Sequence, residues 1–600
     1  MTKAQWSNKF QSTIALLGYS VGLPNLWRFP YVCQRNGGGA FLIPHMFFTI
    51  IVAIPLFFLE SYLGQFSRQG PIGVWAMCPL MKGIGICIMT LSCNCIPYLS
   101  MLLAWALYYF YSSFSTVLPW TTCGNSWNTP QCVAVGDLRR GANVSADIGA
   151  ISINRSASAV TVSYGETNVS HDHGLITVRG HTAAEEFWQN KVLGISSGLD
   201  DVGPVQLHLL VCWFITCVLM FLCIMKGIRS IGKVVYVTTL MPYILLPVLL
   251  VRACMQPGSM EGIMYYITPD FNRLQHSQVW LEGLLQVFFS VGPAWGTIIT
   301  LTSHNSPHNN IVRDSFLIPL IAELTSVFSG FVVFATVGFL AHDLGRPVAD
   351  VITSGPGIGF IVYPEAVSLL PASQLWSLLF FLVVLMMGID SMFANIEATV
   401  ACIEDIWPRR LHMKHLQTVV AAVFLGAVFL VGLPFTTSAG VYIFQLCDWY
   451  VGAVGCFVVG TMECLVVGWC YGVKRFDVDV EVMIGKRLPI VLKLLCFVII
   501  PVFLLVAMGV TIVSYKPPTY GRYDYPHFAV IIGWCIAVSS VVPLPITMVI
   551  QILKKTGSLA QRTKSAMTPS RAWRGFRRRY GIDERTDCTM KENARFIFKR

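Results

Sequence analysis

The chain has 600 residues, of which 54% are hydrophobic and only 12% are charged. About a quarter of the residues of an average soluble domain are charged, so this composition is far from that of a soluble protein. The net charge of +11 does not indicate nucleic-acid binding, because the excess lies in the tail, where residues from 554 onward include fourteen Lys and Arg against four Asp and Glu.

Apolar runs of about twenty residues recur along most of the chain, and each is long enough to cross a hydrocarbon core of about 30 Å. They predict an all-α polytopic membrane protein with twelve transmembrane helices. None of the runs ends in a small-residue cleavage site, so we expect no cleavable signal peptide. The runs cover roughly residues 13–33, 39–62, 85–112, 206–225, 233–252, 280–301, 315–342, 373–402, 416–433, 439–469, 489–513 and 527–553.

The first and sixth runs contain helix-breaking residues. Gly18, Gly22 and Pro24 weaken the first run, and Gly292-Pro293 lies in the middle of the sixth. Proline has no N–H to donate, and glycine is conformationally free. Interrupted helices at corresponding positions of two halves indicate a midplane binding site, in which unwound carbonyls coordinate ions.

Basic residues predict the orientation of the spans. Three short basic loops alternate with the long loop that starts at Leu118, namely Lys226–Lys233, Arg409–Lys414 and Lys474–Arg487. By the positive-inside rule these loops and both termini are cytoplasmic, in a multi-pass plasma-membrane protein. We therefore expect a short cytoplasmic N-terminus at 1–12, a membrane body at 13–553 and a basic cytoplasmic tail at 554–600. The tail is expected to lie near anionic lipid headgroups rather than on nucleic acid.

The long hydrophilic segment at residues 118–203 is then an extracellular loop. It carries three glycosylation sequons, at Asn143, Asn154 and Asn168. It also carries Cys123 and Cys132, a close pair suited to an extracellular disulfide. Both features agree with the orientation that the basic loops predict.

Charged residues inside the runs are functional candidates, because each costs at least about 2.5–3.5 kcal/mol to insert at the centre of a span. Asp390 stands beside Ser391 deep in the eighth run, and a carboxylate with a hydroxyl there fits a hard cation that takes oxygen ligands. For Glu60, Glu397 and Glu463 a satisfied buried hydrogen bond is an equally good interpretation. The full set is Arg28, Glu60, Glu323, Asp390, Glu397, Asp448 and Glu463, with His45 as a further titratable group.

The motifs, in their order and spacing, resemble the neurotransmitter:sodium symporter family. The similarity covers nearly the whole chain and rests on "GYSVGLPNLWRFPY", "NGGGAF", "FFLESYLGQFS", "CGNSWNTPQC", "VFFSVGPAWGTIIT", "HNNIVRD", "SGPGIGFIVYPEAV", "MGIDSMF" and "YIFQLCDWY". It implies a fold of five plus five helices as inverted repeats, with two further helices. It also implies sodium-driven transport by alternating access, with the region 13–553 as the transporter body.

The resemblance assigns one sodium site and two gates. The second sodium site of the family corresponds to backbone carbonyls of Gly18, Val21 and Met387 with the side chains of Asp390 and Ser391. Arg28 and Asp448 correspond to the outer gate. Lys3, where the family has arginine, and Asp405 correspond to the inner gate, and His304 replaces a gate tyrosine.

The solute pocket implied by the resemblance is mostly apolar. Gly22 replaces the aspartate that monoamine transporters use, so monoamines are not expected, and "GPAWG" resembles the glycine-transporter branch. The pocket residues are Ser20, Gly22, Cys95, Leu99, Leu102, Phe289, Gly292, Trp295, Ser391 and Asn395.

Several positions depart from the family around the other subsites. Pro24 removes one N–H of the carboxylate subsite and Leu99 replaces its tyrosine. Ala322 replaces the asparagine of the first sodium site, of which Ser20, Asn25 and Ser290 remain.

The chloride site of the family is altered as well. It keeps Gln286, Ser290 and Ser326, but His45 replaces its tyrosine and the same asparagine is missing. Glu323 is new beside this site. One hypothesis is that Glu323 supplies the negative charge that chloride brings, and the other is that it is a helix-packing glutamate.

The function expected from the sequence is sodium-coupled symport of a small organic solute, an amino acid or a similar molecule, with Na⁺ as the coupled ion and Cl⁻ left open. A monomer suffices for such transport, and a dimer or an accessory subunit is compatible with it.

Each lost hydrogen bond to a charged group is worth about 1.5–3 kcal/mol. The departures are therefore compensated locally, or reflect a solute without a carboxylate there, or mark a non-transporting member with a binding, sensing or scaffold role. No constellation typical of an enzyme is present.

Overall fold

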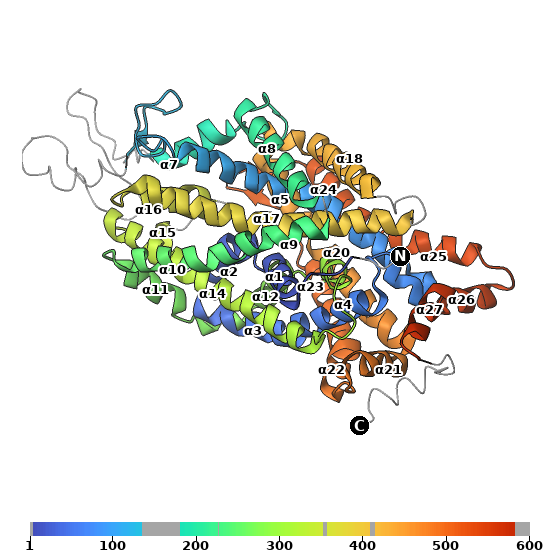
Figure 1. Cartoon of the computed structure of the whole chain (residues 1–600). Coiled ribbons are helices and arrows are strands. Elements are labelled where there is room, and N and C mark those ends of the chain that lie inside the picture. Colours follow the sequence, from blue (N-terminus) through green and yellow to red (C-terminus); the bar gives the residue numbers. More distant parts are fainter. Residues whose placement is uncertain are drawn as a thin grey trace, which may run out of the picture.

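The structure is a computed structural model that describes residues 4–134, 181–225, 227–351, 357–407, 414–521 and 523–582. It consists almost entirely of helices, most of which run along one long axis of the molecule (Figure 1). One end of this bundle carries the disulfide between Cys123 and Cys132, and the other carries the C-terminal helix α27 (Arg571–Arg579). We call them the disulfide end and the tail end.

The helices follow the predicted runs in chain order. The first run gives α1 (Lys9–Ser20), a π-helical turn (Pro24–Arg28) and α2 (Phe29–Arg35), and the sixth gives α12 (Ser277–Ser290) and α13 (Thr297–Thr302). The other runs give α3 (Leu42–Phe48), α4 (Ile54–Ser67), α5 (Gly83–Ser112), α8 (Leu207–Ile224), α9 (Ile228–Thr238), α10 (Leu240–Cys254), α14 (Ile311–Leu344), α17 (Ser373–Ile406), α18 (Lys414–Gly432), α19 (Gly440–Val451), α20 (Ala453–Leu465), α22 (Ile490–Leu494), α23 (Ile500–Val513), α24 (His527–Ser539) and α25 (Pro543–Leu553).

Short elements connect these helices. They are α7 (Ala183–Glu186), α11 (Ser259–Ile267), α15 (Val348–Val351), α16 (Tyr363–Ser368), α21 (Val473–Ile484) and α26 (Leu559–Met567). Two strand pairs complete the described part: β1 (Cys132–Val133) pairs in parallel with β2 (His181–Thr182), and β3 (Thr519–Tyr520) pairs antiparallel with β4 (Tyr523–Asp524).

Within the described residues, nine helical stretches are long and apolar enough to cross a membrane, and the bent pair α24 and α25 makes a tenth. The two predicted runs outside this set are the first and the sixth, which are those that the sequence predicts to be broken. The polytopic helical body is therefore confirmed, whereas the count of twelve spans and the inverted repeat stay predictions.

The tenth run continues beyond a membrane thickness. Its helical stretch, Gly440–Ile484, has 45 residues, which at 1.5 Å per residue is about 68 Å, more than twice the thickness of the hydrocarbon core. The stretch changes direction at Gly472, whose φ of 107° favours glycine. The following helix, α21, therefore lies outside the span.

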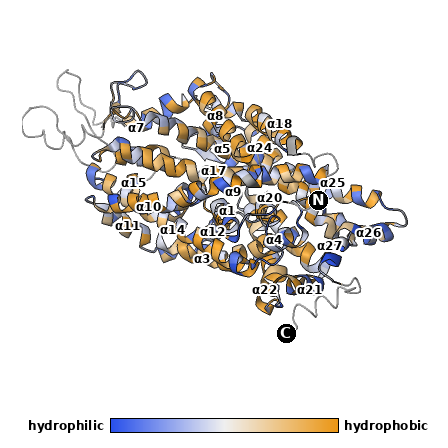
Figure 2. Ribbon diagram, viewed as in Figure 1, coloured by the Kyte–Doolittle hydropathy of each residue, from blue (hydrophilic) through white to orange (hydrophobic). Residues whose placement is uncertain are grey.

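The outer faces of the bundle are hydrophobic. On α8 the exposed side chains include Val211, Phe214, Val218 and Leu222, which recur every three or four residues and so lie on one face. Figure 2 shows hydrophobic residues along the long helices and hydrophilic ones gathered on the tail helices α26 and α27. Such a surface needs a lipid environment, as the composition predicts.

The broken helices are enclosed by unbroken ones. α5 packs along α17, α1 lies against α9, α14 and α17, and α13 lies against α4 and α17. The two breaks are therefore held inside the body, away from its lipid-facing surface.

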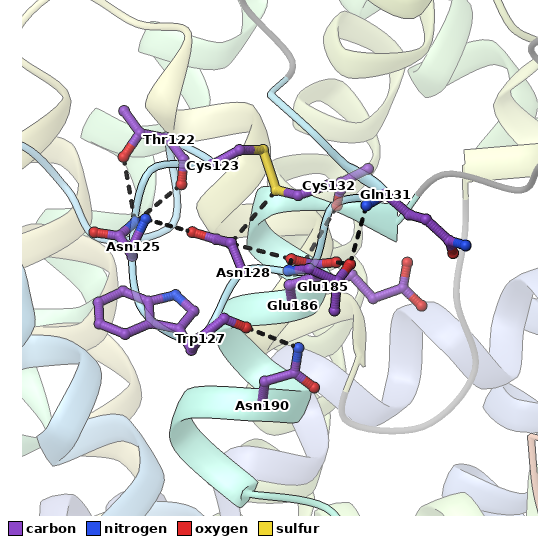
Figure 3. Close-up of a disulfide and its surroundings, with 12 residues drawn as sticks. Thr122, Cys123, Asn125, Trp127, Asn128, Gln131, Cys132, Glu185, Glu186 and Asn190 are labelled. Carbon is purple, nitrogen blue, oxygen red and sulfur yellow. Dashed lines mark hydrogen bonds between the residues drawn. A yellow bond between two sulfur atoms is a disulfide. The ribbon is translucent and has the colours of Figure 1, made fainter. Parts of the chain in front are cut away.

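The predicted disulfide between Cys123 and Cys132 is confirmed, and the loop that it closes is tied to the segment after β2 (Figure 3). The Glu186 carboxylate accepts hydrogen bonds from Asn128 Nδ2 at 3.1 Å and from Thr129 N at 2.9 Å. The predicted sequons at Asn143, Asn154 and Asn168 lie outside the described residues.

Part of the basic tail packs against the body instead of standing in solvent. On α27, Trp573 and Arg577 lie one turn apart and both are buried. Trp573 Nε1 donates to Tyr471 Oη at 3.1 Å, and Arg577 Nε donates to Asp479 Oδ1 at 2.9 Å. The exposed face of α27 includes Arg571 and Arg579. The lipid contact expected for the tail stays a prediction.

Candidate functional site

The first run opens between α1 and the turn that starts at Pro24. Pro24 has no N–H, so the carbonyl of Ser20 has no helical donor four residues on. Asn25 satisfies backbone groups at this break. Its N–H donates to the Gly22 carbonyl at 3.1 Å, and its Oδ1 accepts from Gly22 N at 2.9 Å. A Cβ atom on Gly22 would overlap Ser391 Oγ, so glycine lets α17 approach the break.

The sixth run opens between α12 and α13. Three residues in the gap have positive φ: Gly292 (75°), Ala294 (66°) and Gly296 (72°). The left-handed region is unfavourable for alanine, so neighbouring groups must hold Ala294 in place. Its N–H donates to the carboxylate of Glu60, which is fully buried in α4.

The two openings face one another. Tyr19 Oη donates to the carbonyl of Gly292 at 2.8 Å, and Ser20 Oγ donates to that of Val291 at 3.1 Å. These side chains come from the last turn of α1, and the carbonyls that they bind lie in the gap of the sixth run. The structure thus brings together the two breaks, which lie about 270 residues apart in the chain.

Asp390 lies beside the first opening, on α17, and only 1% of its surface is exposed. A Cβ atom on Gly18 would lie 2.7 Å from Asp390 Oδ2. The neighbouring Ser391 Oγ approaches the carbonyls of Tyr19 at 3.2 Å and of Met387 at 3.5 Å. Val21, buried at the end of α1, completes the predicted set. The atoms of this predicted set that would bind the ion are all oxygens, as a sodium ion requires.

Two partners of Asp390 were not predicted from the sequence. Thr238 and Thr239, at the junction of α9 and α10, donate to its two carboxylate oxygens. The sequence signal near them is Pro242, which has no N–H for the carbonyl of Thr238.

The three residues that remain of the predicted first sodium site are each hydrogen-bonded to a neighbour outside that set. Asn25 Nδ2 donates to Ser326 Oγ at 2.8 Å and approaches the carbonyl of Ala322 at 3.3 Å. Ser290 Oγ donates to the carboxylate of Glu323, so it points toward α14. Ser20 Oγ donates to the carbonyl of Val291. In this conformation the polar side chains of the three residues are therefore engaged within the protein.

Glu323 contacts two residues of the predicted chloride site, Ser290 and Ser326, and the histidine that replaces its tyrosine. Its carboxylate accepts from Ser290 Oγ, from Ser326 Oγ at 3.2 Å, and from His45 Nε2 at 2.6 Å. Both His45 and Glu323 are fully buried. Gln286, in contrast, donates to the carbonyl of Pro24 at 3.1 Å.

The two ring nitrogens of His45 have different surroundings. Nε2 is paired with the carboxylate of Glu323, and Nδ1 is buried with no hydrogen-bond partner among the described residues.

The predicted pocket wall is mostly apolar. Cys95, Leu99 and Leu102 lie on consecutive turns of α5, and Phe289 and Trp295 lie 6.2 Å apart between ring centres. Asn395 Oδ1 accepts from Thr297 Oγ1 at 2.8 Å.

A cavity lies on the disulfide side of this wall, and of the predicted pocket residues only Leu102 lines it. Its lining is Leu23, Leu26, Trp27, Leu102, Val333, Gly359, Phe360, Tyr363, Phe380, Phe381 and Val384.

The predicted outer gate is closed. Arg28 Nη1 lies 3.6 Å from Asp448 Oδ1, and each side chain is about one-fifth exposed. The guanidinium carbon of Arg28 lies 3.9 Å from the ring centre of Phe289. Arg28 therefore covers the pocket and contacts one of its walls.

The tail end is closed as well. Trp6 Nε1 donates to the carbonyl of Leu301 at 3.0 Å, and His304 Nδ1 donates to that of Ala4 at 2.8 Å. Asp405 accepts from backbone N–H groups at 70, 72 and 73. Its predicted partner, Lys3, lies outside the described residues. Contacts between distant segments thus join the structure at both ends of the site.

Comparison with known proteins identifies similar chains over nearly the full length. A family model described as the sodium:neurotransmitter symporter family matches residues 3–555. A creatine transporter of Torpedo marmorata is 39% identical over 574 residues, which cover 95% of this chain and 88% of that protein. The sodium- and chloride-dependent glycine transporters 1 and 2 of Xenopus laevis are 38% and 37% identical; the alignments cover 96% of this chain in both cases, and 88% and 72% of the relatives.

Proposed function

Because the chain belongs to the sodium:neurotransmitter symporter family, we propose that it moves a small organic solute across the plasma membrane together with sodium, by alternating access. The observation that carries this proposal is the meeting of two opened helices beside the buried Asp390. Burial of a carboxylate in a membrane body costs free energy, so a carboxylate that is present there is a candidate for a functional role.

Sodium is the co-transported ion in this proposal. Its ligands would be the carbonyls of Gly18, Val21 and Met387 with the side chains of Asp390 and Ser391. The donors are all oxygen, and the absence of a side chain at Gly18 leaves the approach to Asp390 Oδ2 open. The ion would supply the positive charge that joins α1 to α17.

The two closed gates support alternating access. Arg28 and Asp448 would open at the disulfide end, and Trp6 with His304 at the tail end, each while the other remains shut. With both termini cytoplasmic, the disulfide end would be extracellular. The gates contact the opened helices directly: Arg28 ends the turn that follows the first break, and Leu301 belongs to α13.

The solute proposed is an amino acid or a similar small zwitterion. The relatives are named for glycine and creatine, which are both of this kind. Pro24 and Leu99 remove two groups that would bind a carboxylate, while Gly22 N is bound to Asn25. We expect weaker carboxylate binding than in a site with all these donors, so the solute is selected largely by the apolar wall and by Asn395.

We propose further that transport does not need chloride. The proposal rests on Glu323, which places a carboxylate among His45, Ser290 and Ser326. A fixed carboxylate among these groups would take the part of a bound chloride.

The second candidate function is a non-transporting member with a sensing or scaffold role. It is favoured by the polar groups that remain of the first sodium site, since Asn25 and Ser290 are already hydrogen-bonded to side chains of α14. In this case the protein would bind a solute or a partner without moving it.

The experiment that tests the proposal is uptake of radiolabelled amino acids, creatine and amines into proteoliposomes that contain the purified protein. Accumulation with an inward sodium gradient, absent with choline in place of sodium, supports symport. Solute binding without accumulation in either salt supports the second candidate.

A further inference from the structure

Asp390 is held by two hydroxyl groups from the fifth run. Thr238 Oγ1 donates to Asp390 Oδ1, and Thr239 Oγ1 donates to Asp390 Oδ2 at 2.6 Å. All three side chains are buried. Hydrogen bonds to a charged group are about twice as strong as neutral ones, so this pair stabilises the carboxylate within the membrane body.

The two hydroxyls bind different oxygens, and only one of these oxygens faces the first run. A Cβ atom on Gly18 would lie 2.7 Å from Asp390 Oδ2 and would overlap Thr239 Oγ1. Oδ2 and Thr239 therefore share the gap beside Gly18. Thr238 binds Oδ1, and its other acceptor is the carbonyl of Val234 in its own helix, at 3.0 Å.

The threonines stand at the junction of α9 and α10 in the fifth run. Pro242 has no N–H for the carbonyl of Thr238, and α9 ends there. α9 is in turn joined to α1 by a hydrogen bond from Gln11 Nε2 to the carbonyl of Gly232. Asp390 is thus connected to the tail-end half of the fifth run, which contacts the tail-end half of the first.

We propose that Thr239 competes with sodium for Asp390, and that Thr238 orients this carboxylate for the ion. The inference rests on the sodium site proposed above. An ion beside Gly18 would reach Oδ2 through the gap that Thr239 Oγ1 fills, so the ion and the hydrogen-bonded Thr239 hydroxyl compete for the same space. Thr238 remains on Oδ1 in both conditions. Entry of sodium thereby frees one of the two threonine hydrogen bonds that join Asp390 of α17 to the junction of α9 and α10.

The test measures the sodium concentration that gives half of the thermal stabilisation of the purified full-length protein, with choline as the replacement cation. Thr239→Val removes the hydroxyl but keeps the branched shape. We expect the half-maximal concentration to fall about tenfold, as expected for the loss of one hydrogen bond to a charge. Thr238→Val should raise it by a similar factor. Thr239→Ser and Thr238→Ser keep the hydroxyls and should remain within about twofold of the wild type.

The sign of the change in Thr239→Val decides the question. A rise would make Thr239 a sodium ligand, and no change would make its hydrogen bond purely structural; either result overturns the competition. If Thr239→Val does not fold, Thr239→Ala serves in its place. Asp390→Asn separates the two proposals: if sodium still stabilises this variant, the sodium site itself is wrong and both proposals fail.

Discussion

Glu323 brings a carboxylate into contact with His45, Ser290 and Ser326, and all four side chains are buried. In an interior of low dielectric constant, an anion surrounded by donors is strongly stabilised, and a donor cluster without its anion is destabilised. If the proposed role of Glu323 is correct, this single residue determines whether the protein needs a mobile anion.

We expect that replacing external chloride with gluconate leaves uptake by the wild type unchanged. Glu323→Ala removes the fixed charge and opens space among the same donors, so uptake by this variant should be at least about tenfold lower without chloride than with it, since each charged hydrogen bond is worth about 1.5–3 kcal/mol.

Glu323→Asp, which keeps the charge, is the matched control and should stay independent of chloride. Loss of wild-type uptake in gluconate would show that Glu323 is a packing residue and that the anion binds elsewhere.

At the scale of the helical elements, the openings of the first and sixth runs depend on close contacts between backbone and side chains. Gly22 touches Ser391 of α17, and Gly292 touches the ring of Tyr19. In both cases glycine permits an approach that a side chain would prevent. The breaks are thus positioned by packing, and not by flexibility of the chain.

Gly22→Ala would place a methyl group on Ser391 Oγ. We expect the variant to lose sodium-dependent thermal stabilisation and to be destabilised by about 1–3 kcal/mol, as is usual for overpacking. The matched control is Gly426→Ala on α18, where no atom lies within 4 Å of the added carbon. Sodium-dependent stabilisation of Gly22→Ala equal to that of the control would contradict the proposed approach of α17 to the break.

The tail helix α27 is the second element whose role depends on packing. Arg577 and Asp479 form a buried ion pair, and Tyr62 and Tyr471 also donate to Asp479. Removal of one partner leaves a buried charge, so Arg577→Ala should lower the free energy of unfolding by about 3–5 kcal/mol. Thermal denaturation measures this.

Arg571→Ala, on the exposed side of the same helix, is the control for that experiment and should behave as the wild type. Equal stability of the two variants would mean that α27 is not docked in solution.

For the molecule as a whole, the sequence predicts the membrane body well, because runs of about twenty apolar residues are explained by insertion into the hydrocarbon core. Asp390 and Ser391 can be picked out from the sequence because they are polar residues within such an apolar run. Thr239 could not be predicted, because threonine in a helix usually bonds its own backbone. Docking of Arg577 could not be predicted either, since a basic tail is normally solvated and its partner Asp479 lies 98 residues away in the chain.

The central claim is that the opened helices and Asp390 form a sodium site. The most direct measurement is equilibrium binding of radioactive sodium to the purified protein. We predict saturable binding to the wild type. Glu397→Gln, which alters another acidic residue of the same helix, is the control and should bind sodium in the same way. Asp390→Asn removes the charge of the ligand and should lower the affinity for sodium at least about tenfold. Unchanged saturable binding to Asp390→Asn would contradict the account.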